Sequence, residues 1–253
     1  MTRASEYAIR AGITLAVAGA LVFALWASGY DWDFGEVRRN WRNYLTAVGN
    51  TLLATGVAYG LGLFVGVFVA LARISRALVI RHVGDLYVAI IRGTPFLVLL
   101  FIAVFCVRPL VGNPSRFWTG TVALGLFAGA YIGEIIRGGI ESIERGQFEA
   151  ARSLGMTRGK TMRHVILPQA FKRMIPPLTG ELIALTKESS LLYAIGVWEL
   201  VFIAEQVGLK TAGGFEAYLV AAGIYLAINI PLALLARRLE RRLGKTERSG
   251  VLL

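Results

Sequence analysis

Residues Glu141–Leu178 read ESIERGQFEAARSLGMTRGKTMRHVILPQAFKRMIPPL and form a long polar segment between stretches that are almost wholly apolar. The segment carries three acidic and seven basic side chains, counting only lysine and arginine as basic. Basic residues in a loop between two membrane-spanning helices hold that loop in the cytoplasm. A connection of this length without a function is uncommon. We therefore predict a functional cytoplasmic loop, positioned by a membrane domain.

Within this loop, Gln147–Leu154 consists of good helix formers and is followed by Gly155, which suits a left-handed C-terminal cap. A second helical piece is expected from about Thr157 and should end before Pro168, because the proline ring removes a donor and disfavours helix at the preceding residue. The loop is thus predicted to be a compact helix-turn-helix on the membrane surface. Small residues expected to be exposed there would let another protein's backbone approach closely: Ala150, Ala151 and Gly155.

The composition of the whole chain indicates a polytopic membrane protein. It has 253 residues, of which 56% are hydrophobic and 17% charged, and its mean hydropathy is +0.61, which is too apolar for a soluble domain of this length. A net charge of +11 is compatible with nucleic-acid binding. That function requires a basic face on a soluble fold, whereas these basic residues lie in short runs beside apolar stretches. Anionic lipid and cytoplasmic orientation explain the charge better.

Six apolar stretches are long enough to cross the hydrocarbon core as helices, so the predicted fold is an all-α bundle of about six spans. A cleaved signal peptide remains an alternative for the first stretch, and it leaves the later topology unchanged. The predicted spans are Ala11–Tyr30, Tyr44–Ala72, about Leu86–Val107, Phe117 to about Ile136, about Pro177–Trp198 and Ala217–Ala236.

The distribution of positive charge orients these spans with both termini in the cytoplasm. Nineteen of the 27 lysines and arginines fall on the cytoplasmic side of this arrangement, six fall outside and two lie within spans. The bias has the sign that the positive-inside rule requires. No internal repeat is visible, which argues against a secondary transporter built from paired halves.

Glycine and proline predict local features of the spans. Glycines four residues apart favour close helix packing, and they are Gly56 with Gly60, Gly62 with Gly66, and the series Gly125, Gly129 and Gly133. Pro95 should kink the third span. Residues Phe202–Phe215 are expected to form a connection outside the membrane.

Motifs for catalysis or metal binding are not found. Two histidines (His82 and His164) and one cysteine (Cys106) do not make a typical zinc or redox site. The sequence GMTRGKT at Gly155–Thr161 is one residue too short between its glycines for a phosphate-binding loop and follows a predicted helix rather than a strand. We therefore predict no catalytic, cofactor or metal site, and no hydrolysis by this chain.

The loop resembles the EAA loop of bacterial ABC importer permeases, which docks into an ATPase subunit. The similarity rests on Glu149-Ala150-Ala151, three residues, Gly155, nine residues and then Val165-Ile166-Leu167-Pro168, with valine where that pattern usually has isoleucine. Flanking motifs are similar to those of polar amino-acid permeases, the group serving histidine, glutamine and arginine. They are Arg92-Gly93-Thr94-Pro95, Gly129-Ala130-Tyr131 with Glu134, Arg137-Gly138-Gly139-Ile140, Gly146-Gln147, and Lys187-Glu188-Ser189-Ser190-Leu191, and the resemblance runs from about Trp41 to about Arg242.

This resemblance implies a permease subunit of an inner-membrane ABC importer for a polar amino acid. Its fold would be a five-helix core at 44–242 with the loop at 141–178, preceded by one helix and an outer linker at 1–43 and followed by a tail at 243–253. Implied partners are a pair of ATPase subunits carrying ATP and Mg²⁺, a second permease subunit, identical or related, and a soluble binding protein. The implied docking residues are Gln147, Glu149, Ala150, Ala151, Leu154 and Gly155. An ion-coupled carrier or a channel is the alternative, although it leaves the loop without a role.

Charged residues inside predicted spans mark the candidate translocation path. Each costs roughly 2.5–3.5 kcal/mol at mid-bilayer, so these side chains should face a partner or water. Lys187 beside Glu188 offers both charges that a zwitterionic amino acid needs. The alternative interpretation is that Lys187 forms an ion pair with Glu188 or Glu181 that braces helices. Arg92 either reaches the headgroups or takes part in gating. The candidate path residues are Arg92, Glu134, Glu181, Lys187, Glu188, Ser189 and Ser190.

Overall fold

The protein, described by a computed structural model, is a bundle in which every regular element of the described part is helical. Described are residues 29–210 and 214–249, scattered positions before residue 29, and side chains as far as residue 240. The predicted first span, Ala11–Tyr30, lies mostly outside them. Elements in chain order are α2 (Gly35–Arg39), α3 (Trp41–Arg73), α4 (Leu78–Gly93), α5 (Phe96–Phe101), η1 (Ile102–Val107), η2 (Arg108–Val111), α6 (Arg116–Glu141), α7 (Arg145–Ser153), α8 (Arg158–Thr161), η3 (Met162–Ile166), α9 (Leu167–Glu188), η4 (Ser189–Ile195), α10 (Leu200–Gly208) and α11 (Phe215–Ser249).

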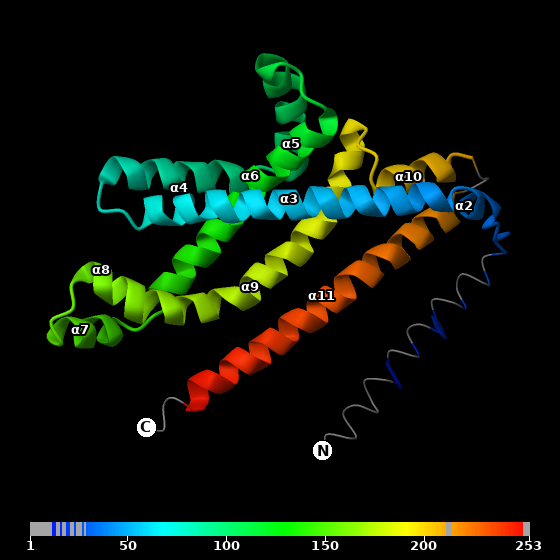
Figure 1. Ribbon diagram of the computed structural model, residues 1–253. Coiled ribbons are helices and arrows are strands. Elements are labelled where there is room, and N and C mark those ends of the chain that lie inside the picture. The colour runs from blue at the N-terminus through cyan, green and yellow to red at the C-terminus, as the bar shows by residue number, and fades with distance from the viewer. Residues whose placement is uncertain are drawn as a thin grey trace.

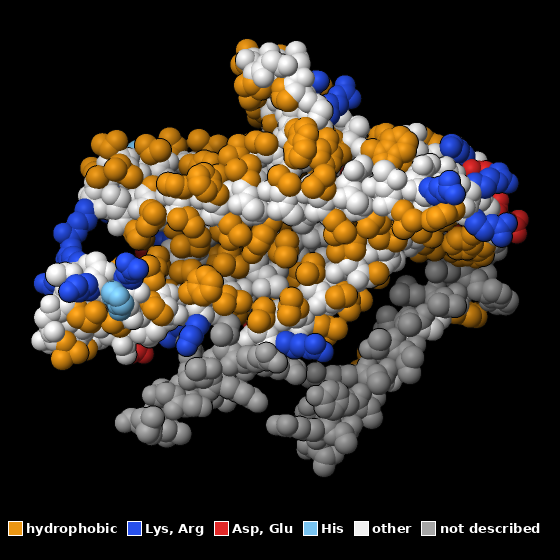
Figure 2. All heavy atoms as spheres, in the orientation of Figure 1, with side chains coloured by type: hydrophobic (Ala, Val, Ile, Leu, Met, Phe, Trp, Pro, Cys, Tyr) orange, Lys and Arg blue, Asp and Glu red, His pale blue; other side chains and the backbone are white. Residues whose placement is uncertain are grey.

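Up to five membrane crossings can be drawn through the described residues. Helices α3, α6 and α11 are each long and apolar enough to cross alone. Two further crossings would each consist of two helical segments with a bend between them: α4 with α5–η2, and α8–η4 with α10. The short helices α7 and α8 lie at one end of the bundle, and α2 and α10 lie at the other (Figure 1). Hydrophobic side chains cover the middle of α3 and α4, whereas lysine and arginine gather around α7 and α8 and around α2 (Figure 2).

The parallel pair α3 and α6 forms the centre of the bundle through glycine contacts. Side chains of α3 pack on the glycines of α6: Leu61 on Gly125, Val65 on Gly129 and Val69 on Gly133. A Cβ at Gly129 would lie 2.7 Å from Val65 Cγ1. These glycines, together with Gly62 and Gly66, confirm the predicted close packing. The prediction is wrong for Gly56 and Gly60 within this chain, because a Cβ at either position would meet nothing within 4 Å.

Replacing Gly66 by alanine is expected to destabilise this pair. The added Cβ would lie 2.6 Å from Ile132 Cγ2 and 3.0 Å from the backbone nitrogen of Gly133, which cannot move aside as a flexible side chain could. We expect a loss of about 1–3 kcal/mol, measured as a lower midpoint of thermal unfolding in detergent. Gly60→Ala is the control, since it adds the same methyl group to the same helix in open space. Equal midpoints for the two variants would contradict this packing.

The break at Arg92-Gly93-Thr94-Pro95 is larger than the predicted kink. Helix α4 ends at Gly93, Thr94 is extended with a ψ of 133°, and α5 begins after Pro95. The two halves are bent by 105°. A residue before proline is driven out of the helical region, and here neither Thr94 nor Pro95 remains helical. The span also begins at Leu78, earlier than the predicted Leu86.

The helix that follows the loop does not end before Pro168, contrary to prediction. The chain stays helical from Arg158 to Glu188 by passing through the π-helical turn η3 immediately before Pro168. A π-helical turn contains one extra residue, so one backbone N–H is left without its usual helical hydrogen bond. Proline has no N–H, so at this position it costs no hydrogen bond. The side-chain amide of Gln169 also donates to the Val165 carbonyl at 2.9 Å. Helix α9 itself begins at Leu167, ten residues before the predicted start of this span at Pro177.

The C-terminal part is more regular than expected. Residues Phe202–Phe215, predicted as a connection, begin within the apolar helix α10, which buries Leu200, Ile203, Ala204 and Val207 against α3 and α11. Helix α11 continues without a break through Pro231 as far as Ser249. It therefore joins the predicted last span to the predicted tail as one helix.

Candidate functional site

Helix α7 is a short element whose C-terminal end is fixed by backbone geometry. Gly155 has a φ of +79°, as its predicted cap position requires. Its N–H donates to the Arg152 carbonyl at 2.9 Å, and the Met156 N–H donates to the Ala151 carbonyl at 3.1 Å. This pair of bonds is a Schellman motif, which satisfies carbonyls that the helix end would otherwise leave open. The turn after α7 is therefore set by Gly155.

The two faces of α7 differ in exposure. Leu154, its C-cap residue, is 84% exposed, an unusual position for a large aliphatic side chain. Ala151 is buried against its own chain, so its predicted exposure is wrong. The sequence pattern could not show this, because small residues suit either a docking face or a close internal contact. The exposed predicted docking residues are Gln147, Glu149, Ala150, Leu154 and Gly155.

A buried apolar cluster holds α7 to the spans on both sides of it. Ile143 before α7 packs with Ile166 and Ala170 of the following helix, and Phe148 of α7 packs on this cluster. The Arg173 guanidinium donates to the Ser142 carbonyl at 2.6 Å, which ties α9 to the end of α6. A cavity of about 500 Å³ with a mixed polar and apolar lining lies beneath α7, between Ile140, Glu144, Phe148 and Met162. Packed side chains therefore join α7 to α6 and to α9.

Glu134 of α6 lies at the centre of a cluster of ion pairs near the same end. Arg73 of α3 contacts it directly, Arg92 Nη1 of α4 lies 3.2 Å from Oε2, and Arg137 Nε lies 3.1 Å from Oε1. Asp85 and Glu141 balance the remaining positive charge by pairing with Arg73 and Arg137. Three arginines thus meet three carboxylates, which limits the cost of removing these charges from water.

The predicted path residues Arg92 and Glu134 are brought together by this cluster. Arg92 also lies over the ring of Tyr131, with its guanidinium carbon 5.1 Å from the ring centroid, a cation–π contact. The ion pairs link α3, α4 and α6 just before α6 enters the loop. Three members of this cluster were not among the predicted path residues: Arg73, Asp85 and Arg137. Only Arg137 carries a local signal, since it lies three residues from Glu134 on one helix.

The remaining predicted path residues lie on α9 and η4, where Glu181 interacts electrostatically with Glu188 and with Arg92 of α4. Lys187 is exposed and forms no ion pair with Glu181 or Glu188. Consecutive residues on a helix point about 100° apart, so Lys187 and Glu188 do not face each other. Both serine hydroxyls donate to carbonyls three residues earlier: Ser189 to Thr186 at 2.8 Å and Ser190 to Lys187 at 2.6 Å. Ser189 is fully buried, and Ser190 is partly exposed.

The family follows from comparison with known proteins. A family model for the inner membrane component of binding-protein-dependent transport systems matches residues 62–245. The chain belongs to this family. It is therefore a multi-pass inner-membrane permease component, which catalyses no reaction, has no cofactor of its own and serves a system whose ATPase is a separate chain. The family and fold expected from the EAA-like loop are confirmed.

Several known proteins are similar to this permease over most of its length. The probable glutamine ABC transporter permease protein GlnM of Bacillus subtilis (strain 168) is 38% identical over 207 residues, which cover 82% of this chain and 96% of the relative. The arginine transport system permease protein ArtQ of the same organism is 38% identical over 198 residues, covering 78% and 90%. A crystal structure of an amino acid ABC transporter with histidines matches with a TM-score of 0.79 and 36% identity, covering 84% of this chain and all of that one.

The permease offers no place for a metal ion among its described residues. No group of three or more His, Cys, Asp or Glu side chains is arranged there to hold one. The candidate sites in the described part of the chain are the surface of α7 and the charged residues of α4, α6 and α9.

Proposed function

We propose that this permease forms, together with a second permease subunit, the uptake path for a polar amino acid, driven by ATP hydrolysis on a pair of ATPase subunits docked at α7. A soluble binding protein would deliver the amino acid from outside. The observation that carries the proposal is the exposed surface of α7 on a buried base shared by α6 and α9. The docking residues would be Gln147, Glu149, Ala150, Leu154 and Gly155, with Ala151 holding α7 to its base.

The polar amino acid is supported by the relatives and by charge. By their names, two relatives serve glutamine and arginine. A zwitterion crossing a medium of low dielectric constant needs compensation for its carboxylate and its ammonium group. Lys187, Glu181 and Glu188 would supply these charges, with Ser190 as a polar neighbour. Ser189 would join them only after a conformational change, because it is buried here.

The second permease subunit is an identical copy or a close relative. Both termini would lie in the cytoplasm, with α7 and α8, because most lysines and arginines fall on that side. The partners are thus proteins, an amino acid and the lipid bilayer, with no nucleic acid.

Proteoliposomes containing the permease, its second subunit, the ATPase and the binding protein test the proposal. We expect ATP hydrolysis and uptake to rise when the binding protein carries a polar amino acid, screened over glutamine, arginine and histidine. Uptake by the permease subunits alone, driven by an ion gradient without ATP, would instead support a carrier.

Lys187→Met separates substrate contact from helix bracing. Because Lys187 is exposed and pairs with no carboxylate among the described residues, we expect the complex to assemble normally. Loss of one charge-assisted hydrogen bond to the amino acid should lower the rate of uptake roughly tenfold and change the order of preferred amino acids. The control is Lys210→Met, an exposed lysine beyond α10. Failure of Lys187→Met to assemble would favour bracing.

A further inference from the structure

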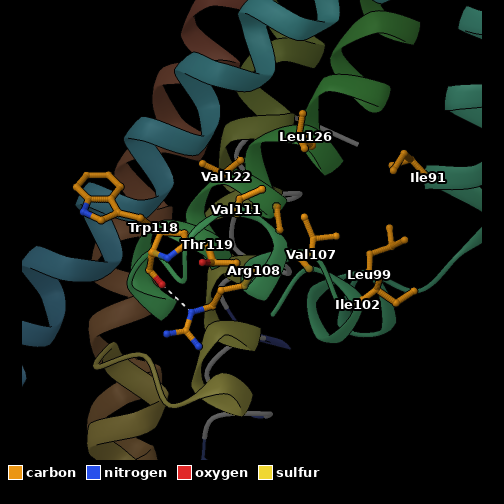
Figure 3. Close-up of a pocket in the computed structure, with 13 residues that line it drawn as sticks. Ile91, Leu99, Ile102, Val107, Arg108, Val111, Trp118, Thr119, Val122 and Leu126 are labelled. Carbon is orange, nitrogen blue, oxygen red and sulfur yellow. Dashed lines mark hydrogen bonds between the residues drawn. The ribbon is translucent and has the colours of Figure 1, made fainter. Parts of the chain in front are cut away.

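An apolar groove opens on the side of the bundle because of the break at Thr94 and Pro95. Helix α4 turns away there, whereas α5 continues along α6, with the Phe96 and Phe127 ring centroids 4.9 Å apart. The space between these three elements is a cavity of about 450 Å³ (Figure 3). Its lining residues are Ile91, Leu99, Ile102, Ala103, Val107, Arg108, Val111, Pro114, Trp118, Thr119, Val122, Ala123 and Leu126.

The groove is polar at one end only. Arg108 and Trp118 lie at that end, and Ile91 and Leu126 lie at the opposite end (Figure 3). Apart from Arg108 and Thr119, all lining side chains are apolar. Tryptophan favours the level of the lipid headgroups, and Trp118 is 48% exposed. The groove thus runs from one membrane surface toward the middle of the bilayer.

The length of the groove suits one hydrocarbon chain. The nine residues from Trp118 to Leu126 span about 12 Å of helix. One leaflet contributes roughly half of a hydrocarbon core about 30 Å thick, so the groove is nearly as deep as a leaflet.

Arg108 is held so that its terminal nitrogens remain available. Its Nε donates to the Pro114 carbonyl at 2.6 Å, and its own carbonyl accepts from the Asn113 N–H at 3.0 Å. This turn uses positive φ values at Gly112 (85°) and Asn113 (55°). No described residue accepts a hydrogen bond from the Nη atoms of Arg108. A fixed guanidinium with free donors matches a phosphate group.

We propose that this groove binds a phospholipid, with one acyl chain between α4, η1 and α6 and the phosphate on Arg108. The lipid would belong to the leaflet on the side of the loop at residues 112–115. It would fill the space that opens where α4 bends away from α5, and so stabilise the bent conformation. This proposal does not depend on which solute the permease transports.

Photo-crosslinking of a lipid in the assembled complex tests the site. The probe is phosphatidylglycerol with a diazirine in the middle of an acyl chain, placed in nanodiscs, with labelled residues mapped by mass spectrometry. We expect labelling around Val122–Leu126 and Ile102–Val107 to exceed that on the exposed face of α11, around Leu226 and Ile230. Val122→Phe, which fills the groove, should lower this labelling several-fold, whereas Leu226→Phe should not.

The role of Arg108 has its own variant in the same experiment. Arg108→Gln should weaken groove labelling roughly tenfold through loss of charged hydrogen bonds. Arg38→Gln, an exposed arginine of α2, is the control and should have no effect. Equal labelling of the groove and α11 would mean ordinary boundary lipid and would overturn the proposal. An unlabelled groove together with cross-linking of a residue that lines it to a second copy would also overturn it, by placing protein there.

Discussion

Replacing Leu154 by aspartate is expected to separate the permease from its ATPase, raising the dissociation constant about 100-fold or more. Leu154 is 84% exposed at the end of α7, on the surface proposed for docking. An apolar side chain placed there would be buried by the partner, and a carboxylate in its place would enter the interface without a counter-charge. The measurement is copurification in mild detergent, followed by titration of the ATPase onto the permease in nanodiscs.

The matched control for this prediction is Leu209→Asp. Leu209 is also the C-cap residue of a nine-residue helix, α10, and is 77% exposed, but it lies at the opposite end of the bundle. The two variants therefore add the same charge in the same local setting. Normal ATPase binding by Leu154→Asp, or a loss caused by Leu209→Asp instead, would contradict docking at α7.

Local chemistry explains the features that could be predicted from the sequence. Gly155 was predicted as a left-handed cap because few other residues adopt that conformation at low cost, and its φ of +79° agrees. The series Gly125, Gly129 and Gly133 was predicted as a packing face because glycines at this spacing share one side of a helix. At these positions the structure agrees with the residue type and spacing, whereas the same spacing at Gly56 and Gly60 gives no contact within the chain.

Features that depend on distant parts of the chain could not be predicted in this way. Glu134 meets Arg73 and Arg92 only because α3 and α4 pack beside α6, and no sequence spacing encodes that meeting. Pro168 was expected to end a helix because the rule assumes α-helical hydrogen bonding throughout. The π-helical turn η3 changes that ladder and makes proline acceptable. Packing also decides that Ala151 faces inward.

These corrections join the loop more closely to the spans than the sequence suggested. Because η3 continues into α9, the helix behind α7 is continuous from the loop to Glu188. Residue Lys187, near its end, is therefore connected through one helix to the base of α7. On the other side, α6 connects α7 to Glu134 and its three arginines. Movement of α7 would thus act on both groups of candidate path residues.

Gly155→Val tests this coupling, because it changes the geometry of α7 without a clash in the bundle. A Cβ at Gly155 would meet nothing within 4 Å, so the variant should insert and fold. A β-branched residue at a φ of +79° costs roughly 1–2 kcal/mol, which favours loss of the Schellman motif and a different direction for Leu154. We expect the increase in ATP hydrolysis caused by substrate-loaded binding protein to be abolished, as measured in proteoliposomes of the complete transporter.

Two substitutions show whether backbone conformation is the cause. Gly155→Asn should keep most of the stimulated hydrolysis, because asparagine tolerates the left-handed conformation. Gly159→Val places the same side chain in α8, where a Cβ also meets open space and the φ is not positive, so it should leave stimulation intact. Normal stimulation in Gly155→Val would mean that the ATPase does not act through the end of α7. Equal losses in Gly155→Val and Gly159→Val would instead identify added bulk on this surface as the cause.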